Sequence, residues 1–224
     1  MEKKAIELKN ATKKLKKRFI LNNFNLTIME NEKIAFVGLN GSGKTTLAEI
    51  LLKLRKLDQG KLIYHRQLKK NAVFQESSFN SILNLQELVF FYYSLHKIKV
   101  NKQQVNLLFK QYNLEEKNKA KFKDLSGGEK QKFKLLIALI NNPEFLLLDE
   151  ITNNLDIRWQ NSIINFLKNK VLNKPTTLIL ISHNLEEIKN LTTKILFFEK
   201  DKNPRFISYS EFLTFFNKMV EFGN

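Results

Sequence analysis

The sequence of 224 residues contains no cysteine, only three prolines and only seven glycines. The absence of cysteine excludes a disulfide framework and a thiolate metal site, and it is typical of proteins of the reduced cytosol. No apolar run approaches the roughly 18 residues that are needed to cross a bilayer. The N-terminal residues 1–4 lead into no apolar signal segment. We therefore expect a cytosolic chain whose core is built from short apolar segments.

Acidic residues are the scarcer charged class, because 22 Asp and Glu stand against 38 Lys and Arg and give a formal net charge of +16. Such an excess attracts nucleic acid or anionic lipid head groups. The alternative is a Lys- and Asn-rich composition whose charges are spread over solvated faces, which gives the same net charge without a charged partner. The basic run at 13–18 contains no aromatic side chain on which a base could stack. We therefore favour a solvated charge and expect no nucleic-acid partner.

Apolar runs of strand length alternate with helical patterns along the chain. The predicted strands are 33–37, 72–75, 145–149, 177–182 and 194–199, and the predicted helices that follow most of them are 45–54, 156–172 and 185–191. Repeated strand–helix pairs are typical of a parallel sheet with helices on its faces. Alternating segments at 5–8 and 25–29 predict an antiparallel β edge. The expected fold class is therefore α/β, with a mainly parallel sheet flanked by helices.

The pattern changes to helices alone between residues 80 and 124. Amphipathic helices are predicted there at 85–97 and 101–112, and a Phe-rich helix is predicted for the tail at 209–222. We expect one domain over 1–224, in which 80–124 form a small helical lobe. The core is then formed by 1–79 and 125–224.

Five of the seven glycines fall in two short clusters, and the first cluster follows a predicted strand. The strand 33–37 runs directly into Gly38-Leu39-Asn40-Gly41-Ser42-Gly43-Lys44-Thr45-Thr46, which contains the complete G-x-x-x-x-G-K-[ST] pattern. The glycines let backbone N–H groups surround the β- and γ-phosphates, and the following helix N-terminus favours negative charge. Lys44 is expected to contact those phosphates and the Thr45 hydroxyl to ligate Mg²⁺. The alternative, a glycine-rich turn without a ligand, is disfavoured by the full spacing and context.

A buried-strand pattern ends in two adjacent carboxylates, Asp149 and Glu150. In open parallel sheets the carboxyl ends of the strands deliver side chains to the crevice where ligands bind. Asp149 is expected to hold Mg²⁺ through water. Glu150, which would point the other way on the pleat, is expected to polarise the attacking water as general base. Alone the pair is a weak signal, but together with the Lys44 loop it predicts a nucleoside triphosphatase core.

The second glycine cluster opens an amphipathic helix predicted at 129–140. A serine and two glycines at a helix N-terminus form a second anion site, although Ser126 could serve only as an N-cap. The segment Leu125-Ser126-Gly127-Gly128-Glu129 resembles the L-S-G-G-Q signature of the ABC ATPases. The resemblance implies that Ser126, Gly127, Gly128 and Glu129 act in trans, on an ATP held by a partner subunit. Two chains would then sandwich two ATP molecules.

Other positions match elements of the same family in the expected order, from about residue 6 to residue 199. Gln75 matches the glutamine that senses Mg²⁺, Asp156 matches the D-loop aspartate at the dimer interface, and His183 matches the switch histidine that contacts the γ-phosphate. The resemblance implies ATP and Mg²⁺ as cofactors. It also implies Lys44, Glu150 and His183 as catalytic residues, with Thr45, Gln75 and Asp149 around the metal.

The sequence departs from the family pattern at several positions. Glu129 replaces the usual glutamine of the signature, and Ile151 stands where proline usually follows the acidic pair. Leu15 falls near the position of the aromatic residue that stacks on adenine, and Phe19 is the nearest ring. Weak base stacking would suit tolerance for other purine nucleotides. The short segment between Lys44 and Gln75 predicts a trimmed antiparallel edge.

The resemblance favours the ATP-binding and ATP-hydrolysing subunit of an ABC transporter, at the cytoplasmic face of the cell membrane. Its partners would be a membrane permease on a separate chain and a second ATPase subunit, the same or related. The alternative is a soluble ATPase of the ABC-F type acting on the ribosome, which the stretch 152–156 and the basic charge favour. A second ATPase unit and the charged linker of that class are not seen in this sequence. A DNA-repair ATPase would need a long coiled-coil insertion, which the sequence also lacks.

Overall fold

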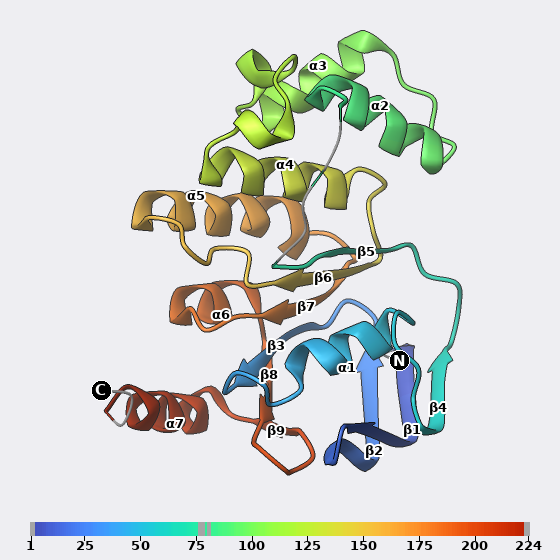
Figure 1. Ribbon diagram of the computed structural model, residues 1–224, viewed down its shortest axis with the longest axis vertical. Helices are drawn as coiled ribbons and strands as arrows, with labels where there is room; N and C mark the ends of the chain where they lie inside the picture. The colour runs from blue at the N-terminus through green and yellow to red at the C-terminus, as the bar shows by residue number, and fades with distance from the viewer. Residues whose placement is uncertain (1–2, 76–78, 80–81, 222–224) are drawn as a thin grey trace.

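The computed structural model describes residues 3–75, 79 and 82–221 (Figure 1). The strands are β1 (Lys4–Leu15), β2 (Arg18–Met29), β3 (Lys33–Gly38), β4 (Gln59–Tyr64), β5 (Lys70–Val73), β6 (Phe145–Asp149), β7 (Thr177–Ile181), β8 (Lys194–Phe198) and β9 (Arg205–Ile207). The α-helices are α1 (Lys44–Leu51), α2 (Leu85–Leu95), α3 (Lys102–Gln111), α4 (Gly127–Leu139), α5 (Ile157–Leu167), α6 (Leu185–Leu191) and α7 (Tyr209–Glu221). Short 3₁₀ turns lie at Glu115–Lys117 and Phe122–Asp124, and a π-helical turn at Lys168–Leu172 extends α5.

The central sheet has the strand order β5-β6-β7-β3-β8-β9. Its first five strands run parallel, and β9 pairs with β8 in the antiparallel sense. Every residue of β3, β6 and β7 is buried, as expected for inner parallel strands covered by helices on both faces. The predicted mainly parallel α/β sheet is thereby confirmed, while the short strand β9 was not predicted.

A separate antiparallel sheet has the order β2-β1-β4. The predicted segments 5–8 and 25–29 were too short, because β1 and β2 each run for 12 residues. Asn10 and Asn23 have positive φ of 49° and 48°, and the register between the two strands shifts between Leu8 and Ala11. Such bulges break the two-residue alternation on which the sequence prediction depended, while the strands continue beyond them. The strand β4 was not predicted.

The core is divided by the central sheet. One apolar cluster lies between the two sheets and includes α1, with Ile6, Leu47 and Phe145 fully buried. A second cluster on the other face joins β6 and β7 to α4, α5 and the helices α2 and α3, which lie at one end of the molecule (Figure 1). Phe109 of α3 and Phe133 of α4 stack within it with ring centroids 6.5 Å apart. The helix α4 therefore connects the end helices to the sheet.

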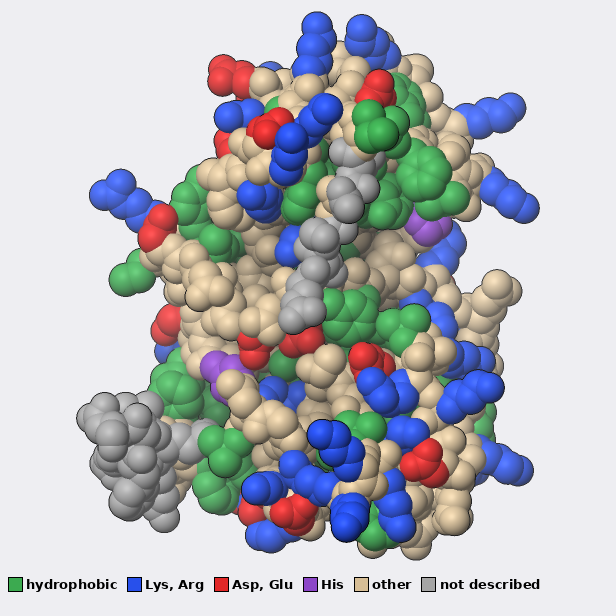
Figure 2. Space-filling model, in the orientation of Figure 1, with side chains coloured by type: hydrophobic (Ala, Val, Ile, Leu, Met, Phe, Trp, Pro, Cys, Tyr) green, Lys and Arg blue, Asp and Glu red, His purple; other side chains and the backbone are tan. Residues whose placement is uncertain are grey.

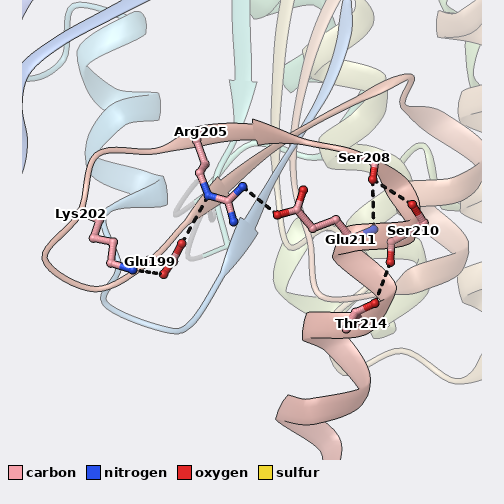
Figure 3. A network of polar contacts seen from close by, with 7 residues as sticks. All are labelled: Glu199, Lys202, Arg205, Ser208, Ser210, Glu211 and Thr214. Atoms are coloured by element: carbon pink, nitrogen blue, oxygen red, sulfur yellow. Dashed lines mark hydrogen bonds and ion pairs between the residues drawn. The ribbon is translucent and has the colours of Figure 1, made fainter.

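The tail helix begins at Tyr209 as predicted and is described to Glu221, so Phe222 of the predicted range lies outside the described residues. Phe212 is buried, and Phe215 stacks on Phe197 of β8 at 4.7 Å between centroids. A polar network faces the solvent beside these contacts, with Arg205 between Glu199 and Glu211 (Figure 3). Because exposed ion pairs contribute little, the aromatic contacts are the main attachment of α7.

Candidate active site

The loop between β3 and α1 is held in a conformation that requires glycine at its two ends. Gly38 has φ 141°, and a Cβ there would lie 2.2 Å from the carbonyl oxygen of Phe198. Gly43 has φ 111°, and its Cβ would lie 2.4 Å from Cγ2 of Ile20. Side chains are therefore excluded at both positions by conformation and by contact. The sequence pattern identified the loop, and the contacts with β2 and β8 explain two of its glycines.

The Lys44 ammonium group lies inside this loop. Its Nζ donates to the carbonyl oxygens of Gly38 at 2.7 Å and Leu39 at 3.0 Å, and the residue is only 6% exposed. Burial lowers the pKa of Lys44, while the charges of Glu150 and Asp149 oppose that shift. The hydroxyl of Ser42 is buried and has no hydrogen-bond partner among the residues that the structure describes. A triphosphate fits this arrangement, because it would supply acceptors to the ammonium, the orphaned hydroxyl and the helix N-terminus.

Asp149 ends β6 directly opposite the first turn of α1. The Thr45 hydroxyl donates to Oδ2 of Asp149 at 3.3 Å. Burial, together with the neighbouring charge of Glu150, raises the pKa of Asp149 to about 6. Among the described residues, no group of three or more His, Asp or Glu side chains could hold a metal by itself. One hydroxyl and one carboxylate suit Mg²⁺, which takes one or two protein ligands and completes its shell with phosphate oxygens and water.

Glu150 lies beyond the end of β6. The sequence analysis derived the direction of its side chain from the pleat of the strand, and that argument was wrong. Its φ of 50° lies in the left-handed region, and the turn therefore directs the side chain. Its carboxylate accepts a hydrogen bond from Nδ2 of Asn153 at 2.6 Å, and the other oxygen lies 3.6 Å from Nε2 of His183. Burial and the charge of Lys44 lower the pKa of His183, while Glu150 opposes this. The imidazole next to the carboxylate is thus favoured in its neutral form.

One pocket of about 570 Å³ joins these elements. Its lining residues come from the glycine loop, the start of α1, β1, β2 and the loops after β5, β6 and β7, and they are Leu15, Ile20, Asn40, Gly41, Gly43, Lys44, Thr45, Thr46, Gln75, Glu150, Asn153 and His183. The sequence-predicted Lys44, Gln75 and His183 therefore lie around one cavity. The sequence analysis did not predict Asn153, whose side chain donates a hydrogen bond to Glu150. An asparagine next to a second asparagine in a loop has no pattern that indicates such a contact.

The pocket wall toward the β1–β2 turn is aliphatic, formed by Leu15 and Ile20, and no described residue of its lining carries an aromatic ring. Phe19 is 40% exposed with Nζ of Lys14 at 4.2 Å from its ring centre. A neighbouring hollow of about 530 Å³ shares Leu15 and is bordered by the basic turn residues 16–18. Lys and Arg side chains gather at that end of the molecule (Figure 2). Weak stacking on the adenine base therefore stays a prediction. In this pocket the base would contact the aliphatic side chains of Leu15 and Ile20 in place of an aromatic ring.

The signature segment does not line this pocket. Ser126 caps α4 in a reciprocal pair with Glu129, since each side chain accepts a hydrogen bond from the other residue's backbone N–H. Glu129 also lies 3.3 Å from Nζ of Lys117, and its hydrogen bond with the Ser126 backbone lowers its pKa. The carboxylate that departs from the family pattern thus serves the helix cap. A second departure from the family pattern, Ile151, is 1% exposed and packs in the apolar core.

A buried carboxyl group, Glu187 of α6, was not predicted from the sequence. It is 0% exposed, and within the described part of the chain neither of its oxygens has a partner in hydrogen-bond geometry. The hydroxyls of Ser182 and Thr152 face it, from the loop before His183 and the loop after Glu150. Burial raises the pKa of Glu187, and the charge of Glu150 adds to the rise. A Leu-Glu-Glu-Ile stretch at a helix start looks solvent-exposed in the sequence, so only the tertiary packing reveals this group.

Replacing Glu187 by glutamine is expected to stabilise the nucleotide-free protein at alkaline pH. Because the folded pKa of Glu187 lies above the unfolded value, the folded state binds the extra proton, and the free energy of unfolding falls as pH rises between the two values. Glutamine does not titrate and avoids this loss. For a chain of this size, about 1 kcal/mol corresponds to about 2–4 °C in Tm. Thermal melts at pH 8 and pH 5 should show the gain at pH 8 and a smaller one at pH 5.

The neighbouring Glu186 is exposed and provides the matched control for that measurement. Glu186→Gln should melt like the wild type at both pH values. An equal Tm gain in both variants, or a gain for Glu187→Gln that grows toward pH 5, would contradict the assignment of a buried, neutral carboxyl group.

The glycine loop between β3 and α1, the Lys44 ammonium group that it encloses and the carboxylates at the end of β6 define a nucleotide-binding domain of the P-loop class. A family model described as ABC transporter matches residues 21–153. The chain belongs to the ABC transporter family and is an ATP-binding subunit of that family. No helix in the described part of the chain has the length and apolar character to span a membrane.

Individual relatives agree with this assignment. The spermidine/putrescine import ATP-binding protein PotA of Clostridium acetobutylicum is 31% identical over 208 residues, covering 87% of this chain but only 58% of the relative. The nickel import system ATP-binding protein NikE of Staphylococcus aureus (strain bovine RF122 / ET3-1) is 34% identical over 205 residues, with 85% of each covered. A solved bacterial Atm1-family ABC exporter with ATP bound has a TM-score of 0.79 at 21% identity, covering 98% of this chain and 41% of that one, and shows the fold alone.

Proposed function

We propose that this chain is the ATP-hydrolysing subunit of an ABC transporter and powers substrate movement through a separate membrane permease. The observation that carries the proposal is the division of two anion sites. Lys44, Glu150 and His183 surround one pocket, whereas the signature segment at the start of α4 lies outside it. A second chain that presents its own signature segment would complete the pocket. The chain therefore works as a dimer that closes around two ATP molecules.

ATP binding follows from the loop geometry. The Lys44 ammonium exchanges its bonds with the Gly38 and Leu39 carbonyls for phosphate oxygens, and the start of α1 faces the same charge. Thr45, Asp149 and Gln75 would hold Mg²⁺, which neutralises charge that develops on the phosphates. Asp149 must be ionised for this role, and cation binding favours that form against the burial that raises its pKa.

Hydrolysis needs a base that accepts a proton from water near the γ-phosphate. Glu150 lies in the pocket with its carboxylate held by Asn153, so it would receive that proton. The neutral imidazole of His183 beside it can donate a hydrogen bond to the phosphate or orient Glu150. Loss of the γ-phosphate removes contacts shared by the two subunits, and the dimer opens.

We infer a division of the chain into a core, 1–79 with 125–224, and a helical lobe, 80–124. We infer that the lobe faces the permease and that the whole chain lies at the cytoplasmic side of the membrane without crossing it. The permease selects the substrate. PotA and NikE serve polyamine and nickel import, respectively, and their chemically unrelated substrates show why the ATPase sequence does not name the substrate here.

The test is affinity purification of the Glu150→Gln protein with MgATP from detergent-solubilised cells, followed by identification of what is retained. We expect a hydrophobic, multi-helix membrane protein in fixed ratio. The Lys44→Ala protein, which should not close on nucleotide, is the control and should retain the partner independently of MgATP. Recovery of ribosomes or ribosomal RNA in place of a membrane protein would overturn the transport proposal and give the +16 charge a role in RNA binding.

A further inference from the structure

The only tryptophan of the chain, Trp159, lies in the first turn of α5 against the start of α4. A Cβ at Gly128 would lie 2.3 Å from Cδ2 of Trp159 and 2.6 Å from its Cε2 and Cε3. Gly128 has no positive φ, so backbone conformation does not demand glycine there. The indole ring demands glycine at position 128, because any side chain there would have to displace the ring. The second signature glycine therefore leaves the space that the Trp159 ring occupies.

The same ring contacts the next turn of α4. Nζ of Lys132 lies 4.6 Å from the centre of the Trp159 ring, a cation–π contact. Residues 128 and 132 share one face of the helix because they are four positions apart. Both positions contact one indole, which limits rotation and sliding of the N-terminal half of α4. That half begins with the capping residue Ser126, so the ring fixes where the signature N–H groups point.

The residue after Trp159 ties the same turn of α5 to the nucleotide pocket. Gln160 donates from Nε2 to the carbonyl oxygen of Leu155 at 2.9 Å and accepts from Nδ2 of Asn184 at 3.1 Å. Asn184 directly follows His183, which lines the pocket. Leu155 packs on the first signature glycine, 3.5 Å from the place of a Cβ on Gly127. Contacts therefore run without a break from the His183 loop through α5 to the signature segment.

We propose that Trp159 is a positioning residue that sets the signature segment for the triphosphate bound by a second copy of the chain. Gln160 links this position to the His183 loop, so that the state of a chain's own nucleotide site reaches the signature segment it presents to its partner. The inference rests on the proposed dimer. The inference goes beyond the dimer by assigning the coupling between the two nucleotide sites to Trp159 and Gln160, which do not line the chain's own nucleotide pocket.

The first test measures MgATP-driven dimerisation of the Glu150→Gln protein by analytical ultracentrifugation. Adding Trp159→Ala should weaken dimerisation by about tenfold or more, within the range by which residues between coupled sites act. Binding of a fluorescent ATP analogue to the monomer should stay within about twofold, because Trp159 lies outside the pocket. Phe206→Ala, which removes another ring with a lysine over it, is the matched control and should change neither quantity.

The second test is a double-mutant cycle that a merely structural role would not reproduce. Gly128→Ala should weaken dimerisation strongly when Trp159 is present, because the new methyl group meets the ring. In the Trp159→Ala background, Gly128→Ala should cost little further, since the space is then open. An equal cost in both backgrounds would mean that position 128 acts directly on the partner's nucleotide and would overturn the inference.

The outcomes separate the inference from the proposed function. A Glu150→Gln protein that stays monomeric with MgATP would overturn the proposed dimer and the inference with it. A normal dimer that is unaffected by Trp159→Ala would overturn the inference alone. Trp159→Phe, which keeps a ring and its lysine contact, should dimerise better than Trp159→Ala and keeps the test decisive if the alanine variant is unstable.

Discussion

Replacing Lys44 by alanine should abolish both nucleotide binding and ATP turnover. The ammonium group is the only cation that lines the pocket among the described residues, and it is buried where the phosphates would lie. Losing one preorganised donor to developing charge commonly costs about 10²–10³ in rate. Here the lost group also holds the ground-state triphosphate, so affinity should fall together with the rate. Equilibrium binding of a fluorescent ATP analogue and steady-state phosphate release measure the two effects.

The loss should not come from unfolding. Lys44 is buried and its pKa is lowered by that burial, so removing it relieves a desolvation penalty while freeing two loop carbonyls. The melting temperature without nucleotide should therefore stay near that of the wild type. Lys56→Ala, at an exposed lysine outside the pocket, should bind and hydrolyse normally. A Lys44→Ala protein that binds MgATP with wild-type affinity would remove this residue from the phosphate site.

The sheet and much of the pocket could be predicted from the sequence because local signals mark them. Strands β3, β6 and β7 are buried on both faces, so each appears in the sequence as an unbroken apolar run. The glycine loop and the Asp149–Glu150 pair mark where two of these runs end. Parallel order then brings the carboxyl ends together, which explains why residues as distant in sequence as Lys44 and His183 line one cavity.

Other features could not be predicted because they depend on contacts between distant segments. The bulges at Asn10 and Asn23 hide the true length of β1 and β2 from a periodicity argument. Burial of Glu187 results from packing against two loops that no local pattern connects. The steric demand of Trp159 on Gly128 joins residues 31 positions apart, and from the motif alone that glycine is assigned only to phosphate binding. Motifs thus identify the chemistry, and tertiary packing decides how the motifs are held.

Replacing Glu150 by glutamine should slow hydrolysis by about 10²–10⁴, the usual contribution of a positioned general base, while MgATP still binds. Glutamine keeps the shape of the side chain, and its amide oxygen can accept the hydrogen bond that Asn153 donates at 2.6 Å. Its loss of charge also removes one cause of the raised pKa of Asp149, so the carboxylate assigned to Mg²⁺ should ionise more easily.

Because nucleotide binding is retained and the γ-phosphate is not released, the Glu150→Gln protein should accumulate as a closed dimer with MgATP, whereas the wild type should form it only transiently. Single-turnover hydrolysis measures the chemical step, and sedimentation with MgATP or MgADP measures closure. Glu186→Gln, at an exposed carboxylate on α6, should hydrolyse ATP normally and not trap a dimer. A Glu150→Gln protein that hydrolyses ATP at the wild-type rate would show that the proton goes elsewhere. His183, 3.6 Å from Glu150, would then become the first candidate to accept it.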